Sequence, residues 1–332
     1  MEEFKLSQEE VENFNKIYSG KYIYAINEQI NKFRPGLENI RNLLLAHTHS
    51  VEYEEKPYTL GDMIKIVYDF YKSLDINLYE KLFSILHDDS VSVNFSEPAK
   101  HDKSRHNVCS QGDRGRKISL APENNLYGLI TVCHEFCHML SQRMQENKRA
   151  VDSTIGEVET LFIEKVFANY LLENGIITNA EYENTMMGGD YSLLGDITYC
   201  FQRNDLLNII DCEQLTGEKV DELVDKLKNN PNCDVLLSRL KKMASLSKTS
   251  PADYSPIERY VIGQIVGTVL FDRYQNDRQC TIEKFKNYIS HNAELTFSQM
   301  LKELLDKDAF GTYNEYMDIK EREFTADREQ EN

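Results

Sequence analysis

The sequence lacks an apolar run long enough to cross a membrane as a helix. A spanning helix needs about 18 or more consecutive apolar residues, whereas the longest candidate, YVIGQIVGTVLF at 260–271, is shorter and contains two glycines. A secretory signal begins with basic and then apolar residues, but residues 1–10, MEEFKLSQEE, are acidic in character. We therefore expect no membrane partner and a cytoplasmic location, although a specialised secretion route would need no such signal.

The sequence also lacks an excess of positive charge and a cysteine framework. Its 55 acidic residues outnumber the 38 basic residues and give a net charge of −17. This balance disfavours a phosphate-binding surface, so we expect no nucleic-acid partner, and it favours a soluble monomer. The seven cysteines are odd in number and scattered, which is typical of reduced thiols in a cytosol.

What the sequence does contain is mainly helical periodicity. The chain has 332 residues, 41% of them hydrophobic, which is enough to bury a core. In TLGDMIKIVYDFYKSL (59–74) apolar residues recur at spacings of three and four, and Thr59 is the expected N-cap. GEVETLFIEKVFANYLLENG (156–175) predicts another long helix. We predict a helical layer over residues 1–88 and one compact region over residues 89–332.

Residues 89–116 interrupt the helical pattern. They gather Pro, Gly, Ser, Asn and charged residues, so we predict a long surface loop. KISLAP (117–122) alternates and is stopped by Pro122, which predicts a short strand at the edge of a sheet. Asn124 or Asn125 then caps the next helix. The predicted fold class is therefore mainly α, with a small β element just before that helix.

The helix that follows carries TVCHEFCHML (131–140). Residues four apart lie on one face of a helix, so His134 and His138 can direct two neutral imidazoles at one metal ion. Glu135 is turned by about 100° from His134 and can reach a water at the metal without being a ligand. This arrangement is typical of zincin peptidases, with the glutamate as general base. Because the surrounding helix is apolar, unpaired polar groups there are costly, which favours a metal site over ordinary partly buried histidines.

A catalytic zinc site needs a third protein ligand and leaves a fourth position open. The next helix offers Glu157, Glu159 and Glu164. Glu157 and Glu164 are seven apart and share a face, whereas Glu159 is turned to the other side and is the poorest candidate. Glu157 and Glu164 lie about 10 Å apart along the axis, so only one of them can bind the ion. Spacing alone leaves that choice open.

These residues resemble the thimet oligopeptidase and oligoendopeptidase F family of zinc metallopeptidases, of which the chain would be a shortened member. The resemblance rests on HEFCH (134–138), on EVETLFIE (157–164) and on YVIGQIVG (260–267), which is similar to the family's tyrosine-bearing helix. YISHNAELTFSQMLKELLDKDAF (288–310) is similar to its closing helices. Together these segments cover most of residues 60–315, in the family's order.

The resemblance implies a role for each matching residue. It implies Zn²⁺ as the cofactor, held by three ligands: His134, His138 and Glu157. It implies Glu135 as general base and leaves Glu164 as a structural residue or an outer partner that orients a nearby group. In the family the strand before the zinc helix pairs with the substrate backbone, which implies peptide binding by three consecutive residues: Ile118, Ser119 and Leu120.

The chain departs from the family pattern in three ways. Cys137 stands where the family usually has glycine, and it is a packing residue, a redox-sensitive position or an unwanted extra ligand. The family places a histidine shortly before its tyrosine helix, whereas SKTSPADYSPIERY (247–260) has none. Oxyanion stabilisation would then fall on Tyr260, with Tyr254 as second candidate. Family members are also commonly much longer, and residues 1–88 can supply only part of the wall of their deep channel.

The expected function is that of a zinc metalloendopeptidase that hydrolyses oligopeptides, with a peptide as its partner. Two alternatives stay open: a peptide-binding protein or effector that keeps the zinc scaffold but turns over poorly, and a protease of one specific folded protein. The presence of Glu135 favours an enzyme, because a protein that has lost its activity is free to lose its general base.

Overall fold

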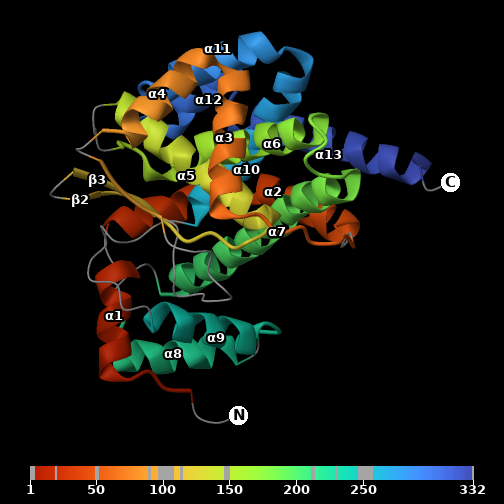
Figure 1. Cartoon of the computed structure of the whole chain (residues 1–332). Coiled ribbons are helices and arrows are strands. Elements are labelled where there is room, and N and C mark those ends of the chain that lie inside the picture. The colour runs from red at the N-terminus through yellow and green to blue at the C-terminus, as the bar shows by residue number, and fades with distance from the viewer. Residues whose placement is uncertain are drawn as a thin grey trace. The chain divides into compact units, whose positions relative to one another are not determined.

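The computed structural model describes residues 4–18, 21–48, 52–88, 91–95, 108–112, 115–145, 150–210, 214–228, 230–245 and 257–330. Within these residues the chain is mainly α-helical, as predicted, with one small sheet (Figure 1). The α-helices are α1 (Gln8–Tyr18), α2 (Lys21–His47), α3 (Leu60–Leu74), α4 (Ile76–Leu86), α5 (Leu126–Met144), α6 (Val158–Glu173), α7 (Asn179–Ile209), α8 (Gly217–Leu227), α9 (Cys233–Ala244), α10 (Glu258–Asn276), α11 (Arg278–Ile289), α12 (Phe297–Leu305) and α13 (Ala309–Gln330). Short 3-10 helices are η1 (Ser153–Ile155) and η3 (Asn292–Glu294). In the described part of the chain, no helix is both long and apolar enough to span a membrane.

The chain forms two compact units, and each combines segments that are distant in the sequence. The first comprises Met1–Leu45 and Leu194–Glu258, and the second comprises Ala46–Leu193 and Arg259–Asn332. This division differs from the predicted boundary at residue 88. Periodicity indicates where helices form, but which helices share a core depends on packing between residues far apart in the chain.

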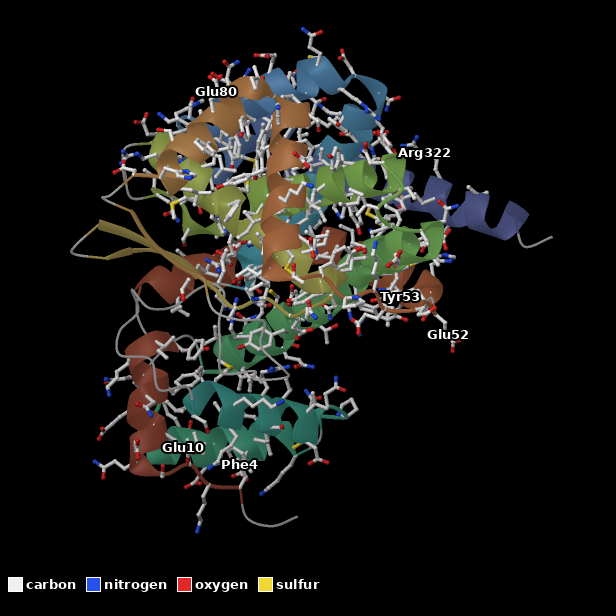
Figure 2. The ribbon with its side chains drawn as sticks, in the orientation of Figure 1. Phe4, Glu10, Glu52, Tyr53, Glu80 and Arg322 are labelled. Carbon is white, nitrogen blue, oxygen red and sulfur yellow. The ribbon has the colours of Figure 1, made fainter. Side chains whose placement is uncertain are left out.

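The first unit has an apolar core to which both of its segments contribute. Phe14 and Ile17 of α1, Leu223 of α8 and Leu240 of α9 are buried in one cluster. Figure 1 shows α1, α8 and α9 packed together. Near the surface, Glu10 of α1, labelled in Figure 2, accepts a hydrogen bond from Lys241 Nζ at 2.7 Å. Apolar packing and this ion pair thus join the two sequence segments that make up the first unit.

The second unit is built around α5 and α6, which pack against each other. Thr59 caps α3 as predicted, in a reciprocal capping box with Asp62. The apolar face of α3 buries Phe70, whose ring centroid lies 4.9 Å from that of Phe167 on α6. α3 also contacts α5. These contacts hold the two helices that carry the predicted metal ligands.

The sheet has three strands in the order β1 (Val91–Phe95), β3 (Gly115–Leu120), β2 (Val108–Gly112). β3 is parallel to β1 and antiparallel to β2. The strand predicted at KISLAP is therefore confirmed, but its predicted position at the edge of the sheet is wrong. The predicted loop over 89–116 is also wrong in part, because it contains β1 and β2. The alternation of VSVNF at 91–95 is a strand signal that the polar composition of its neighbours obscures.

Glycines bring α10 very close to the start of α6. A Cβ atom at Gly263 would lie 2.6 Å from Leu161 Cδ1 and 2.9 Å from the carbonyl oxygen of Glu157. A Cβ atom at Gly267 would lie 3.0 Å from the backbone nitrogen of Phe162. Two helices can approach this closely only where one of them has no side chain. This approach places the N-terminal end of α10 beside the N-terminal end of α6.

Candidate metal centre

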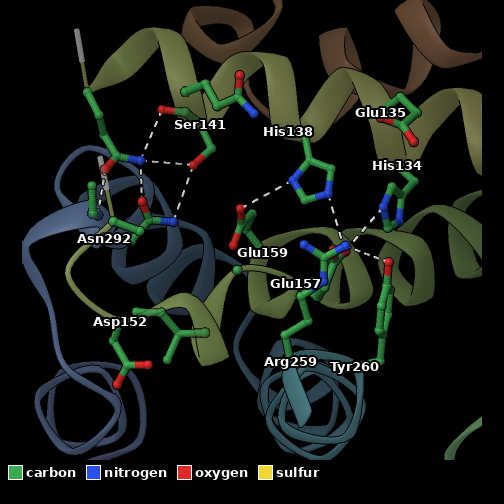
Figure 3. A pocket seen from close by; sticks show the side chains of 16 residues that line it. His134, Glu135, His138, Ser141, Asp152, Glu157, Glu159, Arg259, Tyr260 and Asn292 are labelled. Carbon is green, nitrogen blue, oxygen red and sulfur yellow. Dashed lines mark hydrogen bonds and ion pairs between the residues drawn. The ribbon is translucent and has the colours of Figure 1, made fainter. Parts of the chain in front are cut away.

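Helix α5 presents His134 and His138 on one face, as their spacing predicts. The helix begins after Asn125, whose side chain accepts a hydrogen bond from the backbone nitrogen of Gly128, so the predicted cap is confirmed. The Nε2 atoms of His134 and His138 lie 3.3 Å and 3.2 Å from the same atom, Oε2 of Glu157. Figure 3 shows the two rings converging on this carboxylate.

His134, His138 and Glu157 form a group that could hold a metal ion. Their three candidate ligand atoms all lie within 4.8 Å of one another. Two imidazoles and one carboxylate are the donor set of many catalytic zinc sites, which keep a fourth position open. Glu157 is almost completely buried, whereas both histidine rings are partly accessible. The donor set and its spacing therefore fit a divalent transition metal.

The second nitrogen of each ring faces another carboxylate. Nδ1 of His134 lies 2.6 Å from Oε1 of Glu164, and Nδ1 of His138 lies 3.5 Å from Oε1 of Glu159. Such carboxylates fix the ring orientation and place the protonated nitrogen away from the metal. Glu164 thus contacts the ring nitrogen of His134 that faces away from Glu157, which is the position expected for an outer partner.

The expectation for Glu159 was wrong in one respect. As predicted, Glu159 does not belong to the metal-ligand group. Its side chain was expected to point away from the site, but it faces His138. Glu157 occupies the N-cap of α6 with φ −122° and ψ 3°, so it lies outside the regular helix. The rotation of about 100° per residue applies only inside a helix, and it therefore cannot be counted from Glu157. Both carboxylates consequently face α5.

Electrostatic interactions in this cluster favour a bound cation. Burial opposes protonation of His134, but hydrogen bonds with Glu157 and Glu164 outweigh it and raise its pKa to about 9. The pKa of His138 is also raised against the effect of burial, chiefly by the charge of Glu157. Burial would raise the pKa of Glu157, but the two histidines hold it well below its usual range. A metal ion would displace the protons that the imidazoles otherwise bind.

Helix α10 adds Arg259 and Tyr260 to the same site. Nη2 of Arg259 lies 2.9 Å from Oε1 of Glu157 and donates a hydrogen bond to the hydroxyl of Tyr260 at 2.7 Å. Burial, followed by the charge of Glu157, raises the pKa of Tyr260, so its hydroxyl keeps its proton. The sequence identified Tyr260 but not Arg259, because a single arginine at a helix start carries no pattern. Tyr254 lies outside the described residues.

Glu135 lines the same cavity as the metal-ligand group. The cavity has a volume of about 390 Å³ and is also lined by Arg259 and Tyr260. Glu135 itself is buried. A carboxylate, a hydroxyl donor and a candidate metal site thus border one space, which is one set of groups able to catalyse hydrolysis of a carbonyl compound.

Comparison with solved structures relates this arrangement to known proteins. The chain is similar to a Chlamydophila abortus protein provisionally described as a peptidase, with a TM-score of 0.54, 13% sequence identity and coverage of 97% of this chain and 55% of that chain. It is also similar to a Bacillus anthracis strain Ames protein provisionally described as an oligoendopeptidase F, with a TM-score of 0.53, 14% identity and coverage of 97% and 57%. The chain has an oligoendopeptidase F-like fold. It spans little more than half the length of these two proteins, and no protein-family model and no curated protein matches its sequence.

Within this oligoendopeptidase F-like fold, the predicted substrate strand is paired on both sides at Ile118 and Ser119 and with β1 alone at Leu120. Ile118, Ser119 and Leu120 are in register with Val93–Phe95 of β1 and, at residues 118 and 119, with β2. The side chain of Leu120 is completely buried. At residues 118 and 119 β3 has no free edge, so a peptide that added to this sheet as a strand there would have to pair with β1 or β2.

Cys137 packs between the two ligand-bearing helices. It is completely buried, and its Sγ donates a hydrogen bond to the backbone oxygen of Glu159 at 3.6 Å. Burial raises the pKa of its thiol well above the usual range, so the reactive thiolate is disfavoured. It does not belong to the metal-ligand group. Of the three interpretations drawn from the sequence, this geometry fits the packing residue.

The wall of the cavity away from the histidines contains a polar network that the sequence did not reveal. The side-chain amide of Gln145 donates to Asn292 and to Ser141, and Asn292 Nδ2 donates to Ser141 Oγ at 3.2 Å. The backbone nitrogen of Ala293 donates to Gln145 Oε1. Figure 3 shows Ser141 and Asn292 in this network, well apart from His134. Gln145 and Asn292 are 147 positions apart in the chain, and no local motif signals such a contact.

Proposed function

We propose that the protein is a zinc-dependent metalloendopeptidase that hydrolyses oligopeptides. The observation that carries this proposal is the convergence of His134, His138 and Glu157 in a cavity that Glu135 and Tyr260 also line. The oligoendopeptidase F-like fold supports it. We further propose that the protein acts as a monomer, with peptides rather than nucleic acid as its partner.

Zinc held by these three residues would polarise the scissile carbonyl and acidify a water molecule. Glu135 accepts a proton as the water oxygen forms its bond to the carbonyl carbon. The same carboxyl then donates that proton to the leaving nitrogen as the carbon–nitrogen bond breaks. Because Glu135 regains its ionised form in this way, it serves as both base and acid within one turnover.

Tyr260 stabilises the oxygen that gains negative charge during the attack. Its hydroxyl keeps its proton at neutral pH, since burial raises its pKa. A hydrogen bond to such an oxygen is stronger in the transition state than in the substrate and accelerates the chemical step. Tyr254, the second candidate for this role, remains a prediction.

The decisive experiment is the hydrolysis of a fluorescence-quenched peptide library by the purified protein. We expect cleavage at internal bonds, loss of cleavage after chelation, and recovery when zinc is restored. Absence of cleavage by the zinc-loaded protein, together with retained peptide binding, would contradict the proposal and favour a binding protein. Cleavage of one folded protein but no short peptide would instead indicate a protease of a specific target.

A further inference from the structure

The two oxygens of Glu157 have different surroundings. Oε2 faces Nε2 of both His134 and His138, whereas Oε1 lies 2.9 Å from Nη2 of Arg259. An ion pair with a guanidinium is strong and directional, so Arg259 keeps Oε1 from turning toward the two histidines. Only Oε2 is therefore directed at the position that a metal ion would occupy.

Arg259 is fixed between this carboxylate and Tyr260. It donates to the tyrosine hydroxyl at 2.7 Å, and its guanidinium carbon lies 4.7 Å from the centroid of the Tyr260 ring. Gly263, one turn further along α10, brings this helix against the carbonyl of Glu157. Among the described residues that line the cavity, Arg259 is the only arginine or lysine. Arg259 thus places a permanent cation between a candidate ligand and a candidate oxyanion donor.

The contact with Arg259 also determines what the Tyr260 hydroxyl can do. A phenol has one hydrogen to donate and accepts through its oxygen. Because Arg259 has no acceptor atom, the hydroxyl must be the acceptor in this pair, and its own hydrogen remains available. An arginine here therefore leaves the tyrosine free to donate to a substrate oxygen, whereas a carboxylate in its place would take up that hydrogen.

We propose that Arg259 is a positioning residue with two roles: it holds Oε1 of Glu157, so that a single oxygen is left to bind the metal, and it directs the Tyr260 hydroxyl hydrogen into the cavity. The first role depends only on metal binding, and the second rests on the proposed peptidase function. Arg259 would thereby supply a cationic partner to Tyr260 in a chain whose segment 247–260 contains no histidine.

The test compares Arg259→Gln, which removes the charge, with Arg259→Lys. The lysine keeps the charge but lacks the planar guanidinium group and its several N–H donors. Arg273→Gln is the matched control, because Arg273 lies on the same helix and pairs with Glu315. Zinc dissociation constants are measured by competition with a chromogenic chelator, and kcat and KM with a quenched peptide. Zinc X-ray absorption counts the coordinating oxygens in wild type and Arg259→Gln.

For the first role, we expect Arg259→Gln to bind zinc about tenfold more tightly, because a like charge near the ion is removed. X-ray absorption should detect one additional oxygen ligand as Oε1 is released. Arg259→Lys and Arg273→Gln should stay within about threefold of wild type, since they leave the local charge in place. Weaker zinc binding in Arg259→Gln, or an unchanged ligand number, would overturn this role. Neither measurement requires peptide hydrolysis, so this result stands apart from the proposed function.

For the second role, we expect both Arg259 variants to lower kcat about tenfold or more while KM changes little, because the affected interaction forms in the transition state. In a Tyr260→Phe background the same substitutions should cause no further loss of kcat, since the hydroxyl they position is absent. A full additional loss in that background would overturn the second role, as would an unchanged kcat in Arg259→Gln. If wild-type protein with bound zinc hydrolyses no peptide, the second role fails together with the proposed function.

Discussion

The Nδ1 atom of His134 lies 2.6 Å from Oε1 of Glu164, while its Nε2 atom lies 3.3 Å from Oε2 of Glu157. One imidazole thus joins two glutamates that are seven residues apart. Because each ring nitrogen has its own carboxylate, the two glutamates should contribute to metal binding in different ways.

Glu157→Ala should lose most of the bound metal, whereas Glu164→Gln should keep about one zinc per chain with affinity weaker by about 10- to 100-fold. The first substitution removes a proposed metal ligand, and the second removes only the proposed orienting partner of His134. Elemental analysis and chelator competition measure both effects. If Glu164→Gln loses the metal and Glu157→Ala retains it, the assignment of the third ligand is wrong.

Glu135→Gln should retain the metal content of the wild type and lose hydrolysis, because the amide keeps the shape of the side chain but cannot accept the proton. Metal analysis and single-turnover kinetics check the two parts separately. Near-normal turnover in this variant would show that another group is the base.

Tyr260→Phe should lower kcat by about a hundredfold, with little change in KM, because it removes the hydrogen-bond donor that we propose acts mainly in the transition state. Steady-state kinetics on one peptide substrate is sufficient. An unchanged kcat would transfer the role to Tyr254 or to another donor.

Gly263→Ala should destabilise the protein by about 1–3 kcal/mol, because the added methyl group would overlap with Leu161 and with the backbone of Glu157. Gly188→Ala on α7 is the matched control, since a Cβ atom there meets no atom within 4 Å. It should be neutral or slightly stabilising. Thermal unfolding compares the two, and equal stability of both variants would refute the close approach of α10 to α6.

Asp196→Asn should stabilise the protein above about pH 6 and leave its stability unchanged below about pH 4. Burial raises the pKa of Asp196 from 3.8 to about 6, so the folded state disfavours the ionised carboxyl. The folded state therefore binds a proton more tightly than the unfolded state. Wild-type stability is lost as the pH rises from the usual pKa of 3.8 to about 6. An amide cannot ionise and avoids that loss. Denaturant unfolding of both proteins at pH 4 and pH 8 measures the difference, which should vanish at the lower pH.

Local patterns were sufficient to predict several parts of the molecule. The helices around Thr59 and Asn125 were predictable because caps and apolar periodicity act within a few residues. The convergence of His134 and His138 was predictable for the same reason, since one helical turn brings them to one face. These features depend on interactions that a short segment of chain makes with itself.

Other parts of the site depend on segments that meet only in the folded chain. The orientation of Glu159 follows from the non-helical backbone of Glu157, which no periodic rule describes. β3 lies between its neighbours because of strand pairing, and side-chain alternation does not specify which strands are neighbours. Arg259 reaches Glu157 because glycines let α10 approach α6, across about a hundred residues of sequence. The sequence by itself therefore determined the helices and the histidine pair, whereas tertiary packing alone placed Glu159 and Arg259 at the site, because those contacts depend on the relative placement of distant backbones.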